Sequence, residues 1–407
     1  MVLLLTSIFC SAAAALAQIT VLGKEVYDLT GRELDLGLLG LAEFAPAALL
    51  VLVTGSVADR LDRRRVAAIA LGFEALAAVG LAAYAGSSPT AVGPIFGLVF
   101  AFGIARAFAA PAARALPADI VAPERLPWLV ARFSASWQAA LVVGPVLGGF
   151  LYAVDVRLPY VAVATLLLTS AGALLLMHVP ERQPANVAED PIVETVLHEP
   201  PAAKAGIREA VEGLRFIRRY PLLLGAISLD LFAVLFGGAV ALLPAIAKDR
   251  LGVGAVGLGW LRAAGGIGAG LVTLRLAVRP IRRHIGRTLL AAVALFGVTT
   301  IVLGLTRTFA VAFVAMAVLS GADAISVFVR ATLVPLVTPQ DKRGRVLAVE
   351  NVFIGASNEL GAFESGVAGQ ILGPAGAIVL GGVGTLVIAG TWWFLFPDLR
   401  EVDEFPS

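Results

Sequence analysis

The sequence predicts an all-α membrane protein with twelve transmembrane helices. Of its 407 residues, 59% are hydrophobic and 15% are charged, and the mean hydropathy is +0.90. Soluble domains are about 45–50% apolar and about 25% charged, so lipid is expected to surround most of this chain. The apolar segments lack the alternation of barrel strands, and backbone groups in lipid must be bonded within each segment. Helices are therefore predicted.

Twelve apolar segments have the length that a helix needs to cross a bilayer. They fall near residues 2–26, 36–57, 66–86, 91–113, 128–154, 158–179, 221–247, 254–277, 287–305, 309–333, 346–370 and 373–396. The first segment resembles a signal peptide, because Ala-Leu-Ala-Gln18 looks like a cleavage site with small residues. However, it lacks a basic region at its start and stays apolar to Val26. We expect it to be the first membrane helix.

The basic residues predict the orientation of the chain. If the loops after the even-numbered segments face the cytoplasm, those loops and the C-terminal tail hold 23 of the 31 lysines and arginines. Seven are assigned to the other side, and Arg106 lies within a helix. Cytoplasmic loops are enriched in basic residues. We therefore expect a multi-pass protein of the cell (inner) membrane with both termini in the cytoplasm.

The domain organisation is expected to be two pseudo-symmetric six-helix bundles, over residues 1–180 and 221–397, followed by a cytoplasmic tail over 398–407. The linker between them, 181–220, begins with a proline-rich stretch. Its end places Ile207, Val211, Leu214 and Ile217 on one helical face, which predicts an interfacial amphipathic helix. The linker is thus expected to be flexible at first and helical at its end.

A short internal repeat supports two related halves. Arg114-Ala, followed by Val121-x-Pro123, recurs 216 residues later as Arg330-Ala, followed by Val337-x-Pro339. Both copies fall in corresponding loops, after the fourth and the tenth segment. Paired halves of this kind are found in transporters whose substrate site lies between the halves at mid-membrane.

Several other chemistries find no support in the sequence. The net charge of +2 indicates no nucleic-acid surface, and one cysteine, Cys10, and three histidines offer no metal site inside the membrane. Gly265-Gly-Ile-Gly268-Ala-Gly270 looks like a nucleotide loop, but it lies within a predicted helix and follows no strand. We expect packing glycines there, no cofactor and no enzyme activity.

The loop between the second and third segments carries the first family resemblance. It reads Gly55-Ser-Val-Ala-Asp59-Arg60-Leu-Asp62-Arg63-Arg64-Arg65, which resembles the loop signature of the major facilitator superfamily. Asp62 stands where that family usually has a second glycine, so its turn is expected to be tighter or held by a different bond. The resemblance implies that Gly55, Asp59, Arg60, Arg63 and Arg64 belong to a cytoplasmic gate, in which Asp59 faces the start of the eleventh helix. Alternatively, this cluster only sets the topology.

A second resemblance lies in the fifth segment. Gly144-Pro145-Val-Leu-Gly148-Gly149 is similar to a segment of the antiporters in that superfamily. Proline removes a helix hydrogen bond and glycine admits a neighbouring backbone, which favours a bend with close contact. The alternative is plain helix packing. Val26-Tyr-Asp-Leu-Thr30 and Phe353-Ile-Gly-Ala-Ser-Asn358-Glu359-Leu-Gly further resemble the bacterial branch of enterobactin, macrolide and multidrug exporters. Unlike that branch, the chain lacks a short basic tail before its first helix, which leaves open whether its start is truncated.

Charged groups at membrane depth are the candidates for substrate and proton binding, because each costs at least about 2.5–3.5 kcal/mol to insert. These groups are Glu43, Arg106, Asp230, Asp323, Glu359 and Glu364. We expect Glu43 and Arg106 to pair, either for transport or as a structural ion pair. Glu359 and Glu364 are either coupling carboxylates or a packing site shared with Ser357 and Asn358. Gln138 is a candidate for substrate contact, with packing as the alternative.

Together these features predict a secondary active transporter of alternating access. The resemblance implies a proton-coupled antiporter, embedded in the lipid bilayer and expected to be a monomer, that exports a drug-like or siderophore-like amphipathic small molecule. The sequence shows no ATP-binding loop, so an ion gradient is the expected energy source. A proton-linked uptake symporter of the same fold stays open, as does a membrane-embedded lipid-handling protein or enzyme.

Overall fold

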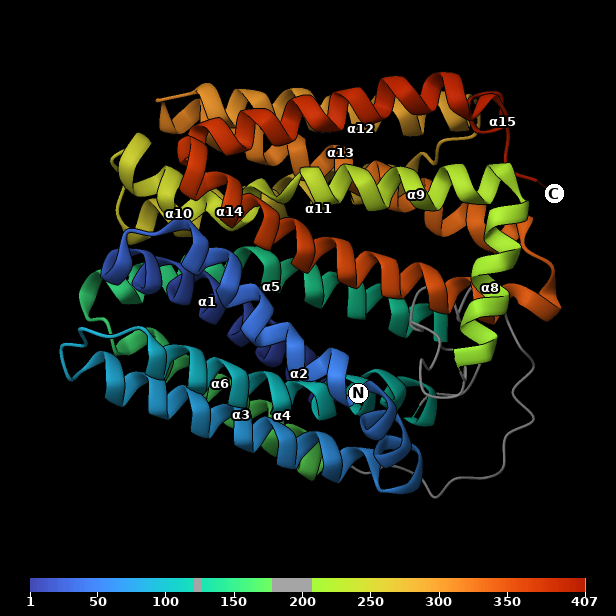
Figure 1. Cartoon of the computed structure of the whole chain (residues 1–407). Helices are drawn as coiled ribbons and strands as arrows, with labels where there is room; N and C mark the ends of the chain where they lie inside the picture. Colours follow the sequence, from blue (N-terminus) through green and yellow to red (C-terminus); the bar gives the residue numbers. More distant parts are fainter. Residues whose placement is uncertain (121–125, 178–206, 407) are drawn as a thin grey trace. The chain divides into compact units, whose positions relative to one another are not determined.

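The computed structural model describes residues 1–120, 126–177 and 207–406, and these residues form helices and no strand (Figure 1). Contacts between Cα atoms divide the chain into two compact units. The first comprises residues 1–29 and 42–204, and the second comprises residues 30–41 and 205–407. The all-helical fold class predicted from the composition is confirmed.

The first unit is built mainly from six long helices. They are α1 (Val2–Thr30), α2 (Glu33–Arg60), α3 (Arg63–Ala85), α4 (Gly93–Ile120), α5 (Leu126–Val154) and α6 (Leu158–Leu176). Their shared core is rich in alanine, as in Ala14, Ala78 and Ala112, and is filled by Phe102 and Leu167. Small residues let helix backbones approach closely in lipid, where packing replaces the hydrophobic effect as the driving force.

The second unit contains the remaining helices and the first turns of α2. These helices are α8 (Ile207–Arg219), α9 (Pro221–Phe236), η2 (Gly238–Leu242), α10 (Leu243–Ala245), η3 (Ile246–Arg250), α11 (Ala255–Val278), α12 (Ile285–Leu305), α13 (Phe309–Val337), α14 (Gln340–Leu395) and α15 (Pro397–Arg400). Within this unit α11 packs against α13, and α12 packs against both α13 and α14. Gly265 and Gly268 lie at the α11–α13 contact: a Cβ at Gly268 would meet the Ala317 carbonyl oxygen at 1.8 Å. The prediction of packing glycines is confirmed.

Two breaks shape the long helices of the second unit. The helix that starts as α9 changes at Gly237 to a 3-10 turn, η2, and later to a π-turn, η3. A Cβ at Gly238 would lie 2.3 Å from the Gly361 carbonyl oxygen of α14. The second break is in α14, where Gly373 has φ 74° and ψ 159°, a conformation that glycine adopts without the steric cost of a Cβ atom.

The number of membrane crossings follows from these breaks. Among the described residues, ten helices are long and apolar enough to cross a membrane, with α14 counted once. At about 1.5 Å per residue, the 56 residues of α14 would extend far beyond a hydrocarbon core of about 30 Å. The break at Gly373 divides α14 into two crossings. With α2 included, the described chain has the twelve long helices that the sequence predicts.

Both short ends of the second unit are packed rather than loose. In α8, Ile217 is buried against Leu223, Val334 and Val346, so the helix predicted to lie at the membrane interface also joins the protein core. The tail after α15 turns back to the start of α12. There the Gly286 amide donates to the Val402 carbonyl at 3.0 Å, and His284 Nδ1 lies 2.7 Å from Asp403 Oδ1.

Candidate functional site

A buried network of charged side chains lies inside the second unit. Arg330, on α13, places Nη2 2.6 Å from Asp230 Oδ1 on α9 and Nη1 3.5 Å from Glu350 Oε1 on α14. All three residues are at most 6% exposed. A guanidinium can serve two carboxylates at once because its donors are arranged in a planar fork. Arg330 therefore links three helices of this unit.

The Arg330 network corrects one sequence-based prediction and adds a residue. Arg330 was counted among the cytoplasmic loop charges, but it lies within α13 and is buried. The expected segment ended at residue 333, so Arg330 stood near a helix end, where basic residues usually indicate the cytoplasmic side. Glu350 was not predicted as a site residue, although it lies inside the expected segment 346–370. The rule that flags charges at membrane depth would have found it.

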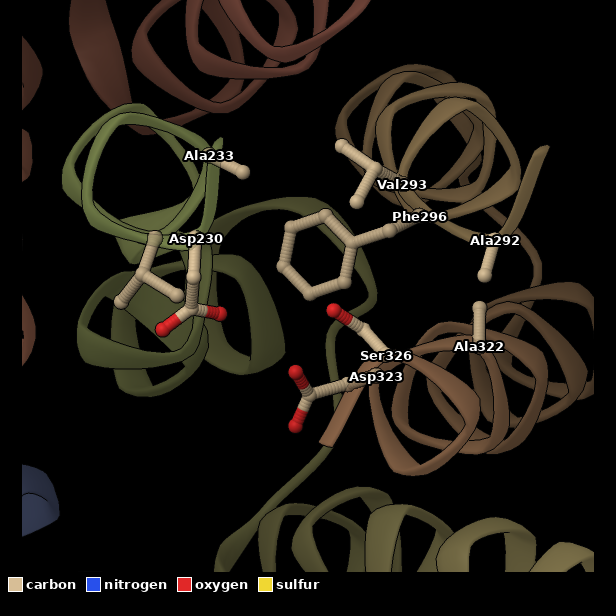
Figure 2. A pocket seen from close by; sticks show the side chains of 9 residues that line it. Asp230, Ala233, Ala292, Val293, Phe296, Ala322, Asp323 and Ser326 are labelled. Atoms are coloured by element: carbon tan, nitrogen blue, oxygen red, sulfur yellow. The ribbon is translucent and has the colours of Figure 1, made fainter. Parts of the chain in front are cut away.

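Asp323 extends the Arg330 network along α13. It lies seven residues before Arg330, about two helical turns away and on the same helix face, and the charges of Asp230 and Arg330 act on it. A small cavity separates the helices here, and Figure 2 shows the carboxylates of Asp230 and Asp323 directed into it beside the Phe296 ring and the Ser326 hydroxyl. The volume of this cavity is about 10 Å³, which is roughly the room for one water molecule.

The composition of the Arg330 network leaves its charges unbalanced. The single guanidinium of Arg330 pairs with Asp230 and Glu350, and its charge also acts on a third carboxylate, Asp323. If all three were ionised, two negative charges would remain uncompensated in a buried setting, which is costly. The chemistry that this arrangement supports is binding of a proton or another cation.

A second group of charges lies inside the first unit. Glu74, on α3, is 2% exposed, and the charges of Arg106 on α4 and Glu43 on α2 both act on it. Glu43 and Arg106 were predicted as a pair, and the structure places Glu74 near both. Glu74 was missed because it stands in an alanine-rich helix, although it falls within the expected segment 66–86. Two carboxylates and one guanidinium thus lie within electrostatic range of one another, and among the described residues the three form no ion pair.

The loop signature between α2 and α3 is described only in part. Gly55, Asp59 and Arg60 fall at the end of α2, but the details of these three side-chain positions lie outside the described residues. Asp62 is the N-cap of α3: its Oδ1 accepts from the Arg64 amide at 3.0 Å and from the Arg65 amide at 3.4 Å. An aspartate thus holds the turn at the position where the family usually has glycine, because its side chain bonds the first amides of the next helix.

One basic residue of the loop signature, Arg64, contacts the end of α6. Arg64 Nη1 donates to the carbonyl oxygen of Met177, the last described residue of that region, and Arg63 stands at the first position of α3. Carbonyl groups at a helix end lack intrahelical partners and are stabilised by such donors. The role of these residues in a gate stays a prediction.

The glycines of the α5 motif lie directly against α1. A Cβ at Gly144 would be 2.7 Å from the Ala13 carbonyl oxygen, and one at Gly148 would be 3.0 Å from the Ala17 carbonyl oxygen. The helix continues through Pro145 and Gly149. The two backbones are therefore in close contact at two successive turns, which any side chain larger than hydrogen would disturb.

The remaining predicted site residues are carried by α14 and α5. Glu359 and Glu364 are half-buried on α14, and Ser357 and Asn358 both donate to the Ile354 carbonyl of the same helix. Those two donors are thus used on the helix backbone. Gln138, on α5, buries Nε2 with no hydrogen-bond partner among the described residues, so its role as a substrate contact stays a prediction.

Two further buried polar groups change the sequence-based interpretation. The adjacent charges of Lys24 and Glu25, near the outer end of the first expected segment, predict a surface pair. In the structure Glu25 is 5% exposed and accepts a hydrogen bond from Tyr160 on α6, while Lys24 pairs with Asp28. Arg262 is one of the seven basic residues assigned to the outer side by the charge count, but it lies within α11, inside the expected segment 254–277. Its Nε is buried without a hydrogen-bond partner among the described residues.

Searched over the described residues, the chain holds no group of three or more histidine, cysteine, aspartate or glutamate side chains that could bind a metal ion.

Comparison with known proteins identifies relatives of this chain. Residues 3–362 match the profile described as Major Facilitator Superfamily. Multidrug resistance protein 1 of Bacillus subtilis (strain 168) is 31% identical over 135 residues, a match that spans 33% of this chain and 32% of that protein. The chain thus matches about a third of the length of this curated relative.

Solved structures share the fold at low sequence identity. A bacterial homolog to the human lysosomal transporter Spinster matches with a TM-score of 0.71 at 18% identity, over 97% of this chain and 96% of that one. The nucleoside transporter NupG matches with a TM-score of 0.61 at 17% identity, over 98% and 97% of the two chains. These matches show that the chain shares the overall fold of these proteins.

Proposed function

Because the chain belongs to the Major Facilitator Superfamily, a family of multi-pass membrane transporters for small molecules, we propose that it is a proton-coupled antiporter. In this proposal it exports an amphipathic small molecule, of the drug or siderophore class, from the cytoplasm by alternating access. The observation that carries the proposal is the set of three carboxylates around Arg330 in the second unit.

The imbalance of charge in the Arg330 network supplies a mechanism for exchange. A buried group with more carboxylates than guanidinium groups is stabilised by an added proton or by a cationic group of a substrate. Proton and substrate then compete for the same negative charge, so binding of one favours release of the other. Asp323 is our candidate for the exchanging carboxylate, because it borders the cavity and forms no ion pair with Arg330 among the described residues, whereas Asp230 lies 2.6 Å from Arg330.

Two observations favour export over uptake. The α5 segment Gly144-Pro145-x-x-Gly148-Gly149 resembles the antiporter segment of the family, and its glycines are packed against α1. The curated relative carries the name Multidrug resistance protein 1. Export of an amphipathic compound is the activity that both features fit.

The test is accumulation of three probes in cells: ethidium, a macrolide and a catechol siderophore. Cells that produce the protein should hold less of at least one probe than cells without it, and an uncoupler should abolish the difference. Replacing Asp323 by Asn should remove the difference as well, whereas Asp398→Asn, which neutralises an exposed carboxylate of α15, should leave it.

Three outcomes would contradict the proposal. Higher accumulation in producing cells would indicate an uptake symporter. A difference that survives the uncoupler would remove proton coupling. Full export by the Asp323→Asn variant would remove the Arg330 network from the coupling step, even if export itself is observed.

A further inference from the structure

A basic pocket lies between α8 and the start of α14, apart from the Arg330 network. Four cationic side chains line it: Arg215 and Arg219 from α8, and Lys342 and Arg345 from α14. One carboxylate, Glu212, lies among them and pairs with Arg345 at 3.0 Å. The pocket has a volume of about 270 Å³, close to the lower end of the range for small-molecule sites, about 300–1,000 Å³.

The walls of this basic pocket are held in place by packing. The Lys342 ammonium lies 4.8 Å from the centre of the Phe216 ring, and a Cβ at Gly213 would be 2.7 Å from the Arg345 carbonyl oxygen. Ile217 anchors α8 in the core of the second unit. The four cations are thus presented by a fixed pair of helices, which lowers the cost of ordering them when an anion binds.

The outer face of α8 combines apolar and basic residues. Val211 is 45% exposed and Leu214 is 37% exposed, and Arg215 and Arg218 follow them on the same side of the helix. α8 ends two residues before Pro221, where a membrane-spanning helix begins, and Lys342 stands in the first turn of another. Figure 1 shows α8 at the end of α9, beside the start of α14. An exposed face of this kind at the end of a span is typical of contact with lipid headgroups.

We propose that the basic pocket binds the phosphate of an anionic phospholipid headgroup. Three of the four cations remain for the ligand once Arg345 is paired with Glu212, so the pocket favours a group that carries net negative charge. The exposed Val211 and Leu214 face the acyl region of the same lipid. This combination selects a phospholipid over a free anion, which has no apolar part.

The test measures binding of phosphatidylglycerol to the delipidated full-length protein in a neutral detergent, by native mass spectrometry. Phosphatidylcholine and inorganic phosphate serve as the comparison ligands. We expect phosphatidylglycerol to bind more tightly than phosphatidylcholine and to resist displacement by inorganic phosphate. The double variant Arg215→Gln/Arg219→Gln should bind it about 25-fold more weakly, at about fivefold for each cation near an anionic lipid.

A matched control separates the pocket from general charge. Arg282→Gln/Arg287→Gln removes two exposed cations around the start of α12, outside the basic pocket, and should leave the affinity unchanged. Lys342→Gln is the second test variant and should weaken binding about fivefold. Equal binding of the neutral lipid, equal loss in the control, or displacement by inorganic phosphate at matched concentration would overturn the proposal.

Discussion

Replacing Arg330 by Gln should destabilise the second unit strongly. The substitution removes the guanidinium that lies 2.6 Å from Asp230 and 3.5 Å from Glu350, and it leaves both carboxylates buried. Removal of one partner from a buried ion pair costs about 3–5 kcal/mol, because the remaining charge has lost its compensation. We expect the free energy of unfolding to fall by about that amount. Two carboxylates lose their partner, which increases the loss, but either can take up a proton, which limits it.

The assay is denaturation of the purified protein in mixed detergent micelles, for Arg330→Gln, Asp230→Asn and the double variant that combines them. Asp230→Asn alone should cost less than Arg330→Gln, because Arg330 keeps Glu350 as a partner. The double variant should be more stable than Arg330→Gln, with a coupling energy of about 1–3 kcal/mol. Arg287→Gln, at an exposed position of α12, is the control. Additive effects, or a loss below about 1 kcal/mol for Arg330→Gln, would refute the network.

Three further predictions concern the first unit. Gly144→Ala should lower the free energy of unfolding by about 1–3 kcal/mol and slow transport, because the new methyl group meets the backbone of α1. Gly97→Ala is the control: it has open space around it and should be neutral or stabilising. Equal effects at both sites would contradict the close contact. Asp62→Ala should lower the stability measured by thermal unfolding by about 1 kcal/mol, and Asp62→Gly should lower it by only a few tenths, which is the difference expected for an N-cap residue. An identical loss for both variants would argue against capping. Glu25→Gln should lower the free energy of unfolding by about 1–3 kcal/mol, because it changes a buried hydrogen-bond acceptor. Asp28→Asn, in the i,i+4 ion pair with Lys24, should lower it by less than about 0.5 kcal/mol. The reverse order would favour a surface pair of Lys24 and Glu25.

The sequence predicted the fold well because lipid allows few alternatives. Backbone groups in hydrocarbon have to be bonded within a helix, so each long apolar segment had one physical interpretation. Helix ends were predicted less well. α14 begins at Gln340 rather than at residue 346, and α4 continues to Ile120 rather than ending at residue 113, because polar residues extend these helices beyond the apolar signal.

Of the two breaks in the helices of the second unit, the one after Gly237 was not predicted and the one at Gly373 was. The 3-10 and π turns after Gly237 depend on the contact of Gly238 with α14, which is a tertiary effect without a local pattern. At Gly373 the expected boundary between segments, 370–373, coincides with the positive φ. There a Gly-Pro pair supplied a local signal that tertiary contacts did not override.

The site could be predicted only in part. Asp230 and Asp323 were recognised because a carboxylate at mid-helix has no topological explanation. Arg330 and Arg262 were counted as orientation signals, because basic residues near span ends also encode orientation and composition alone does not separate the two roles. Their partners depend on which helix faces are in contact, and that is set by packing of small residues that leave no charge pattern in the sequence.

The most direct test of the account follows proton movement in proteoliposomes that contain the purified protein and a pH-sensitive dye in their lumen. The probe that shows the largest uncoupler-sensitive export in cells is added from one side. The account predicts that its addition drives proton movement in the opposite direction, and that Asp323→Asn abolishes this movement while Asp398→Asn preserves it. Probe transport with no accompanying proton movement, or unchanged proton movement in the Asp323→Asn variant, would contradict the central claim.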